Sequence, residues 1–196
     1  SFGSGQLGLS RSERRGAVEY AISGTIQASR GDFRFFDDRG TRYNLEDDRF
    51  TGRINNDGFL FAALGWVRIK LKKHVTLTLL ESFSLKEKGV PGPGFAQAEH
   101  TRTWALHQVL DAKLDHRRFL HRNLSAMVRL NVQVTEDRFR DPYSELGIGV
   151  QDQRDRAVTA GLVGRLSWAP HAPQLLTLGL WGGLSFLLAL WLFRWT

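Results

Sequence analysis

The sequence predicts an all-β fold: an antiparallel segment of a transmembrane β-barrel with about eight long strands, in which short turns and long loops alternate. Apolar and polar residues alternate along stretches of about a dozen residues, roughly twice the usual strand length in soluble proteins. Composition agrees, since 20 Gly, 13 Phe and only 5 Pro among 196 residues favour strands over helices. Only the C-terminal tail has a helical alternative.

The clearest strand lies at 124–135. Its apolar positions are Leu124, Ala126, Val128, Leu130, Val132 and Val134, and the intervening positions are Ser125, Met127, Arg129, Asn131, Gln133 and Thr135. Because successive side chains of a strand point to opposite faces, one face of this strand is apolar and the other is mainly polar.

The same alternation of apolar and polar residues predicts the remaining strands. They span 5–11, 17–29, 59–71, 75–85, 103–115, 158–168 and 174–180, and the first and last of these alternate weakly. Two polar residues, Glu81 and Gln108, interrupt otherwise apolar faces. A tilted strand of about 9–11 residues crosses a bilayer, so these lengths favour a membrane barrel.

The connections between the strands fall into two classes. Short polar joints lie at 13–16, 72–74, 117–123 and 170–173, whereas long loops lie at 30–48, 86–100 and 139–156. Such an alternation is typical of outer-membrane barrels, whose lumen is polar. The candidates for the lumen-facing side are Asp111, Lys113, Arg129, Asn131, Gln133 and Arg165. A soluble antiparallel barrel or sandwich is the alternative, because it also alternates and turns.

Composition and charge exclude several classes of protein. The chain has no Cys, which removes disulfide frameworks, thiolate zinc sites and cysteine nucleophiles. Its 27 Lys and Arg exceed its 20 Asp and Glu, and a basic chain is a candidate nucleic-acid binder. These charges spread over turns and polar faces without a basic stripe, so we expect outer-membrane lipid as a partner and no nucleic acid. The six His form no catalytic set, so we expect neither an enzyme nor a cofactor.

The long loops are the expected ligand-facing elements, although no single contact residue stands out within them. Loop 30–48 contains four carboxylates that could supply oxygen ligands to Ca²⁺, without the spacing of an EF-hand. These candidates are Asp37, Asp38, Asp47 and Asp48. The alternative is a solvated loop in which the same carboxylates pair with Arg34, Arg39 and Arg42.

The C-terminal tail breaks the alternating pattern. Residues 175–193 carry no formal charge and are long and apolar enough for a transmembrane helix, and the alternation ends after Leu180. Our interpretation is that 175–180 begins another strand of a barrel portion at 1–180. Residues 181–196 would then be a separate apolar tail, an aberrant end to the chain.

Several loop motifs resemble those of a known family. Gly31-Asp32-Phe33, Asp37-Asp38-Arg39-Gly40-Thr41, Asn44, Asp47-Asp48 and Arg53-Ile54-Asn55-Asn56-Asp57 are similar to the first barrel hairpin of TonB-dependent outer-membrane receptors, particularly the vitamin B12 and siderophore receptors. The string Gly89-Val90-Pro91-Gly92-Pro93-Gly94 resembles the next extracellular loop. Arg138-Phe139-Arg140-Asp141-Pro142 with Glu145-Leu146-Gly147 resembles the loop after that.

The resemblance implies a function. Receptors of this family enclose an N-terminal plug in a barrel of about 22 strands, and they import a scarce nutrient chelate with energy passed from an inner-membrane TonB complex. The chain would be about the first third of such a barrel, without its plug, in the outer membrane of a Gram-negative bacterium. The alternative is an autonomous eight-stranded barrel with a structural or adhesive role, and a lipolytic barrel comes third because no catalytic set is visible.

Overall fold

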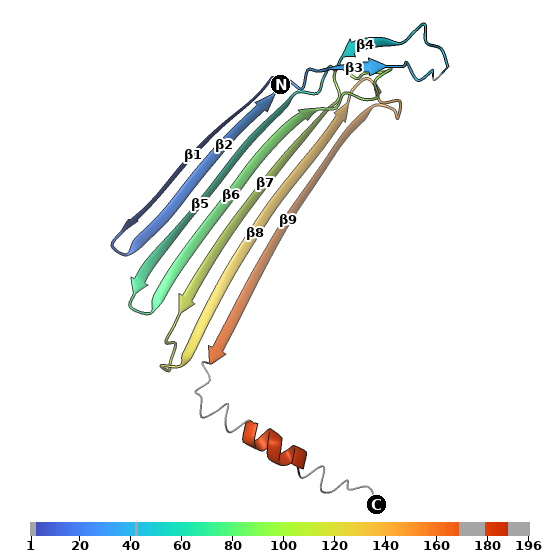
Figure 1. Cartoon of the computed structure of the whole chain (residues 1–196). Coiled ribbons are helices and arrows are strands. Elements are labelled where there is room, and N and C mark those ends of the chain that lie inside the picture. Colours follow the sequence, from blue (N-terminus) through green and yellow to red (C-terminus); the bar gives the residue numbers. More distant parts are fainter. Residues whose placement is uncertain (1–2, 42, 169–178, 188–196) are drawn as a thin grey trace, which may run out of the picture.

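The computed structural model describes residues 3–41, 43–168 and 179–187. Within them, seven long strands form one antiparallel sheet and two short strands form a second. The strands are β1 (Ser4–Arg15), β2 (Val18–Ser29), β3 (Arg34–Asp37), β4 (Arg49–Gly52), β5 (Gly58–Lys72), β6 (Val75–Gly89), β7 (Arg102–His116), β8 (Leu124–Asp141) and β9 (Gln151–Trp168). The large sheet has the order β1-β2-β5-β6-β7-β8-β9, so each long strand pairs with the next long strand along the chain (Figure 1). The antiparallel all-β fold is therefore confirmed.

The pairing register gathers the apolar positions of all seven strands on one face, here called the apolar face. Leu110 of β7 lies opposite Val132 of β8, and Val132 lies opposite Ala160 of β9. The intervening positions, such as Asp111 opposite Asn131, form the polar face. A slip by one residue would exchange the two faces, so the alternation along each strand specifies this register.

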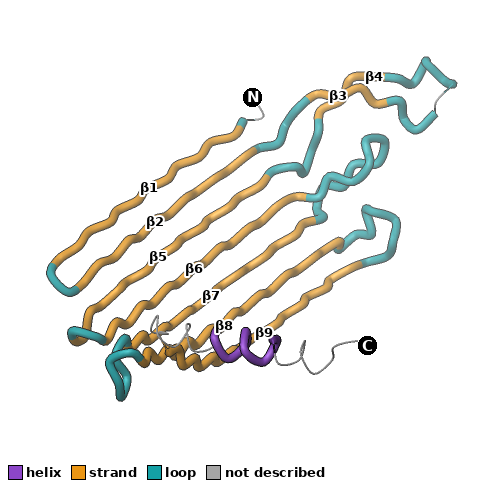
Figure 2. Tube along the Cα trace, turned by 60° about the horizontal axis from the view of Figure 1, so that its bottom comes forward, coloured by secondary structure: helices purple, strands orange, loops and turns teal. Residues whose placement is uncertain are grey.

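No described part of the chain covers the apolar face. The described strands lie in one layer, and the β3–β4 hairpin lies beyond the strand ends (Figures 1 and 2). Residues of this face that remain largely exposed include Leu7, Leu9, Ile22, Leu110, Leu130, Val158, Leu162 and Leu166. Among the described residues, Ala98 is the only buried hydrophobic residue, and it lies in a loop. A sandwich or a closed soluble barrel would bury this face, and the sheet does not.

The two polar residues on the apolar face contact each other. The Gln108 side-chain amide donates a hydrogen bond of 3.1 Å to the Glu81 carboxylate. The two lie on neighbouring strands, β6 and β7, one diagonal step apart in the register. Each therefore satisfies part of the hydrogen-bonding need of the other on a surface that is otherwise apolar.

The polar face is concave. A groove of about 890 Å³ near the short turns is lined by polar-face residues from every long strand. Each long strand contributes at least one residue to this lining. In sheet order from β1 to β9, examples are Arg14, Glu19, Arg68, Thr78, Lys113, Ser125 and Arg165. One groove can touch all seven strands only if the sheet curls around this face.

The short turns lie at one end of the sheet, here called the turn end. Two-residue loops join β1 to β2 and β5 to β6, and the loop 117–123 joins β7 to β8. Gly16 has a φ of 56°, a left-handed conformation that favours glycine. Neighbouring turns also contact each other, since the Arg117 N–H donates to the His74 carbonyl at 2.9 Å.

The strands are longer than the alternation indicated, so several expected boundaries were wrong. The strand expected at 5–11 is Ser4–Arg15, and the joint expected at 13–16 is only the turn at residues 16 and 17. The loops expected at 86–100 and 139–156 shrink to 90–101 and 142–150. Backbone pairing continues beyond the apolar stretch, where both faces carry polar residues and hydropathy no longer alternates.

The loop expected at 30–48 is not without structure. It contains β3, which pairs with β4 in a small antiparallel hairpin. The rings of Phe36 and Phe50 meet edge to face, with their centroids 5.6 Å apart. Alternation over four residues is too short a signal to separate such a strand from a loop.

The expected strand at 174–180 is wrong at its C-terminal end. Residues 174–178 lie outside the described residues, and 179–187 are helical. β1 and β9 are the two edges of the described sheet, and no closed barrel forms within it. No helix among the described residues combines the length and apolarity needed to span a membrane.

Candidate ligand-binding loop cluster

The three long connections meet at the end of the sheet opposite the turn end. They are 30–57, between β2 and β5; 90–101, between β6 and β7; and 142–150, between β8 and β9. They lie together above the strand ends in Figure 1 and are joined by polar contacts. Together with Asp141 at the end of β8, these segments are called the loop cluster below.

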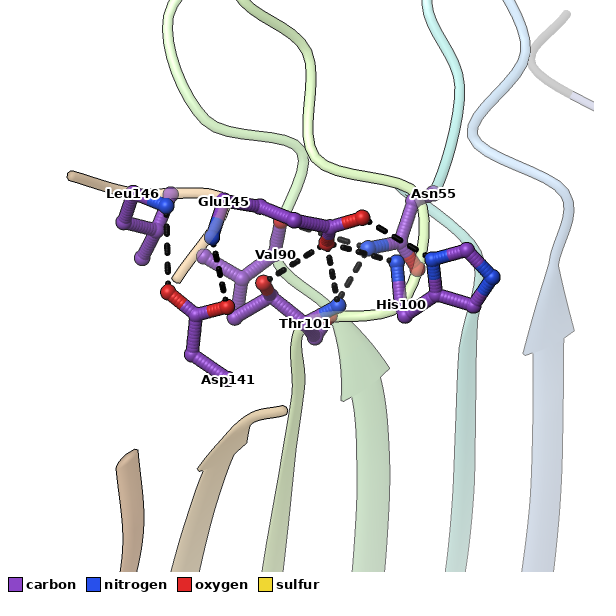
Figure 3. Close-up of polar contacts among 7 residues, drawn as sticks. All are labelled: Asn55, Val90, His100, Thr101, Asp141, Glu145 and Leu146. Carbon is purple, nitrogen blue, oxygen red and sulfur yellow. Dashed lines mark hydrogen bonds and ion pairs between the residues drawn. The ribbon is translucent and has the colours of Figure 1, made fainter. Parts of the chain in front are cut away.

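Glu145 connects two of the loops (Figure 3). One carboxylate oxygen accepts hydrogen bonds from the N–H groups of His100 and Thr101, at 2.8 and 3.1 Å, and from the Thr101 hydroxyl at 3.0 Å. The other lies 2.9 Å from Nδ1 of His100. Burial alone would raise the pKa of Glu145, but the hydrogen bonds from His100 and Thr101 outweigh it and lower the pKa to about 2.

Asp141 organises the start of the same loop. Its side chain is fully buried at the end of β8 and accepts the N–H groups of Glu145 and Leu146 at 2.8 and 3.0 Å. Burial raises the pKa of Asp141, and these backbone hydrogen bonds lower it below the ordinary value on balance. The loop therefore turns around a buried carboxylate, which places Glu145 against His100.

Asn55 joins the first loop to the second. Its side-chain amide donates to the Thr101 carbonyl at 2.7 Å and to the Val90 carbonyl at 3.3 Å (Figure 3). The chain passes so close here that a Cβ on Gly89 would lie 2.4 Å from the Asn55 carbonyl oxygen. Position 89 therefore requires glycine.

A second contact holds the β3–β4 hairpin against the loop 90–101. The Arg53 guanidinium donates to the Gly92 carbonyl and lies 5.4 Å from the centroid of the Phe35 ring. Gln97 accepts the Ile54 N–H through its side-chain oxygen and donates to the Gly52 carbonyl, both at 3.0 Å. One anchoring side chain therefore comes from the segment that follows β4 and the other from the loop 90–101.

Ion pairs hold the base of the loop cluster together. Arg102, the first residue of β7, pairs with Asp57 at 2.8 Å and with Glu87 at 2.9 Å. Hydrogen bonding from this guanidinium holds the pKa of Asp57 below its usual range.

Aromatic side chains lie on the outside of the loop cluster. Tyr143 and Phe95 are 68% and 56% exposed, and the Tyr143 ring meets the His100 imidazole edge to face at 4.8 Å. Exposed rings on an ordered loop framework suit contact with a ligand that has apolar surface.

The four candidate calcium ligands have different local surroundings. Asp37 and Asp38 accept the N–H groups of Arg39 and Gly40, and Asp47 accepts the Thr41 hydroxyl. One carboxylate oxygen of Asp48 is buried without a hydrogen-bond partner. No group of three His, Cys, Asp or Glu in the described ranges could hold a metal ion. The calcium site stays a prediction, as does the pairing with Arg34 and Arg39, while Arg42 lies outside the described residues.

The sequence located the three long loops but did not predict the contacts that join them. Glu145 and Asn55 stand in the motifs quoted above, yet their contacts with residues about 45 positions away have no local signal. The lumen-face candidates are on one face, and Arg129 and Asn131 both contact Asp111, at 2.7 and 3.2 Å. No family model, curated protein or solved structure matches the chain.

Proposed function

We propose that the sheet is part of the wall of a transmembrane β-barrel in the outer membrane of a Gram-negative bacterium. In this proposal the barrel is a TonB-dependent receptor and transporter for a scarce nutrient such as a siderophore or vitamin chelate. The observation that carries the membrane part is the exposed apolar face, which spans seven strands and is left uncovered by the part of the chain that the structure describes. A contiguous apolar surface of this extent requires an apolar surrounding.

The height of the apolar face supports the proposal. On β8 the apolar positions run from Leu124 to Val134, and on β9 from Trp168 back to Val158. These stretches, 124–134 and 158–168, match the length of about 9–11 residues that a tilted strand needs to cross a bilayer.

A charged band ends the apolar face on the loop side. The next positions on that face are Glu136, Arg138 and Arg140 on β8, opposite Arg156, Arg154 and Asp152 on β9. Arg138 pairs with Asp152 at 2.8 Å, and Arg154 pairs with Glu136 at 2.7 Å. Charged groups are costly in hydrocarbon, so this band supports a membrane boundary below it.

The open edges favour a wall segment over an autonomous small barrel. β1 and β9 each have one neighbour in the described sheet. Unpaired backbone groups are not tolerated in a bilayer, so further strands must pair with both edges. A closed eight-stranded barrel would instead need an additional strand between β1 and β9.

The receptor part of the proposal rests on the resemblance together with the loop cluster. Among the motif residues, Asn55 and Glu145 come from two different loops and Gly89 is the last residue of β6, and all three lie in or against the loop cluster. A ligand would contact the outer surface of the loop cluster, where Tyr143 and Phe95 are exposed. Gene deletion tests this part: it should abolish TonB-dependent growth on one siderophore or on vitamin B12, and unchanged growth on every chelate would contradict it.

Single-cysteine labelling tests the membrane part, because the chain has no Cys of its own. Leu130→Cys places a thiol on the apolar face and Asn131→Cys places one on the polar face of the same strand. In membranes from cells that express the protein, a water-soluble maleimide should label Asn131→Cys at least about tenfold faster than Leu130→Cys. Both should react fully in urea, and equal labelling in the folded protein would overturn the proposal.

A further inference from the structure

We infer that the groove on the concave polar face, near the turn end, binds a compact anion that carries two or more phosphate or carboxylate groups. The inference rests on the proposed function in one respect, that the polar face lines an aqueous lumen. It concerns the end of the sheet opposite the loop cluster, so it adds a second site to the molecule.

The groove carries an excess of positive charge. Its lining includes six cationic side chains: Arg14, Arg68, Lys70, Lys113, Arg117 and Arg165. The same lining includes two carboxylates, Glu19 and Asp115. Six cations against two carboxylates leave a formal excess of four positive charges around about 890 Å³. A concave surface with one sign of charge concentrates its field in the groove.

The two carboxylates are already committed to neighbours. Glu19 lies 3.3 Å from Arg68, and Asp115 lies 3.0 Å from Lys113. Within the described residues, no ion pair joins Arg14, Lys70, Arg117 or Arg165 to a carboxylate. Four cations that face one groove repel one another, and a bound polyanion would remove that repulsion.

The strand register places these charges side by side. Arg14 lies opposite Glu19, Glu19 opposite Arg68, Arg68 opposite Thr78, and Thr78 opposite Lys113. Directly opposite residues have Cβ atoms about 5 Å apart. The row therefore brings cations of β1, β5 and β7 to the same height on a curled sheet.

A second row lies one step nearer the turns. It runs from Lys70 through Thr76 and Asp115 to Met127 and Arg165. Cations from the two rows, on different strands of the same face, can contact separate oxygens of one ligand. A ligand with several anionic groups gains from this arrangement more than a single phosphate does.

Hydroxyl groups complete the groove. Its lining includes Thr76, Thr78, Ser125 and Ser167 beside the cations. Phosphate and ionised carboxylate oxygens only accept hydrogen bonds, and Lys, Arg and hydroxyl groups donate them. The groove volume is in the usual range for small-molecule sites, so its donors and its size both fit a compact polyanion.

Binding to the full chain in detergent micelles tests the inference, with pyrophosphate and citrate as separate probes in isothermal titration calorimetry. We expect at least one probe to bind and its affinity to fall as salt increases. The double variant Lys70→Gln/Arg165→Gln should weaken binding by about tenfold or more for each charge removed. The conservative variant Arg165→Lys should retain most of the affinity.

The matched control is Arg156→Gln. It removes one positive charge from the apolar face of β9, outside the groove. Absence of binding by both probes, unchanged affinity in the double variant, or an equal loss per charge in the control would overturn the inference. Circular dichroism checks that each variant keeps its β-structure.

The anion site and the membrane proposal fail separately. Protection of Leu130→Cys with no anion binding would contradict only the site. Anion binding with equal labelling of Leu130→Cys and Asn131→Cys would contradict only the membrane proposal. A preference between pyrophosphate and citrate identifies which chemical class the groove takes.

Discussion

At the residue scale, Glu145 links two loops because its carboxylate is ionised. Its side chain is only 16% exposed, and three donors from His100 and Thr101 surround one of its oxygens. A protonated carboxyl would present a hydrogen to groups that themselves donate, so protonation and this geometry are in conflict.

The low pKa of Glu145 predicts a pH dependence of the loop cluster. The pKa is about 2 in the folded protein and 4.5 ordinarily, so the ionised group stabilises the fold fully above the ordinary value. This stability is lost as the pH falls from about 4.5 through about 2. Hydrogen exchange of the amides of 99–101 and 145–146 should accelerate over this range, beyond the intrinsic pH effect.

The control for this prediction is Glu145→Gln, which keeps the size of the side chain without its charge. Its exchange in these segments should be fast already at neutral pH and should lose the acid-dependent step. Glu46→Gln, in the exposed part of the first loop, should behave like the original chain. A step of unchanged size in Glu145→Gln would assign it to another group.

At the element scale, the loops are ordered by close backbone approaches. Gly31 has a φ of 62°, and a Cβ at that position would lie 2.0 Å from the Asn56 carbonyl oxygen. The Asn56 amide also donates to the Gly31 carbonyl at 3.1 Å. The chain that leaves β2 and the chain that enters β5 are therefore locked together below the β3–β4 hairpin.

Gly31→Ala should destabilise the loop cluster. The left-handed conformation alone costs about 1–2 kcal/mol for a residue with a Cβ, and the clash with the Asn56 backbone adds to this. We expect a loss of at least that size in the free energy of unfolding by urea in detergent, together with faster proteolysis in 30–57.

Gly161→Ala is the matched control. Gly161 lies in β9, and a Cβ there would meet no atom within 4 Å. Its effect on the free energy of unfolding should stay within about 0.5 kcal/mol. Equal losses in the two variants would contradict the role assigned to the close approach.

At the scale of the whole molecule, the sheet is a curled single layer with two free edges in the described residues. Its stability comes from ladder hydrogen bonds, cross-strand contacts and the loop cluster, since the large apolar face is exposed. The proposed function places lipid on one face of this layer and further strands at its edges, and both expectations can be measured.

Disulfide trapping in a chain without native Cys reports whether the edges meet. Leu130 and Leu162 are direct neighbours on β8 and β9, so Leu130→Cys/Leu162→Cys should form an intramolecular disulfide. Leu9→Cys/Leu162→Cys, which joins β1 to β9, should not. The chain refolded in detergent should likewise give no boiling-sensitive shift in gel mobility. A boiling-sensitive shift would instead indicate an autonomous small barrel, whether or not an additional strand separates β1 from β9. A β1–β9 disulfide would show in addition that the two edges meet directly.

The sequence by itself determined what depends on local pattern. Alternation predicted all seven long strands and the two faces, because side chains on a strand change sides at every residue. It also located the long loops, since Gly, Pro and charged clusters interrupt the alternation. It placed strand ends too early, because hydropathy stops alternating before the backbone stops pairing, as at Arg138 and Arg140 on β8.

Only the tertiary structure decided what depends on pairing between distant residues. The contact of Gln108 with Glu81, the convergence of Asn55 and Glu145 on the segment 100–101, and the rows of cations across the groove all follow from the register. So does the lack of pairing between β1 and β9 in the described sheet. The physical reason is that a single strand carries its own two faces, whereas its neighbours, its curl and its edges are properties of the assembled sheet.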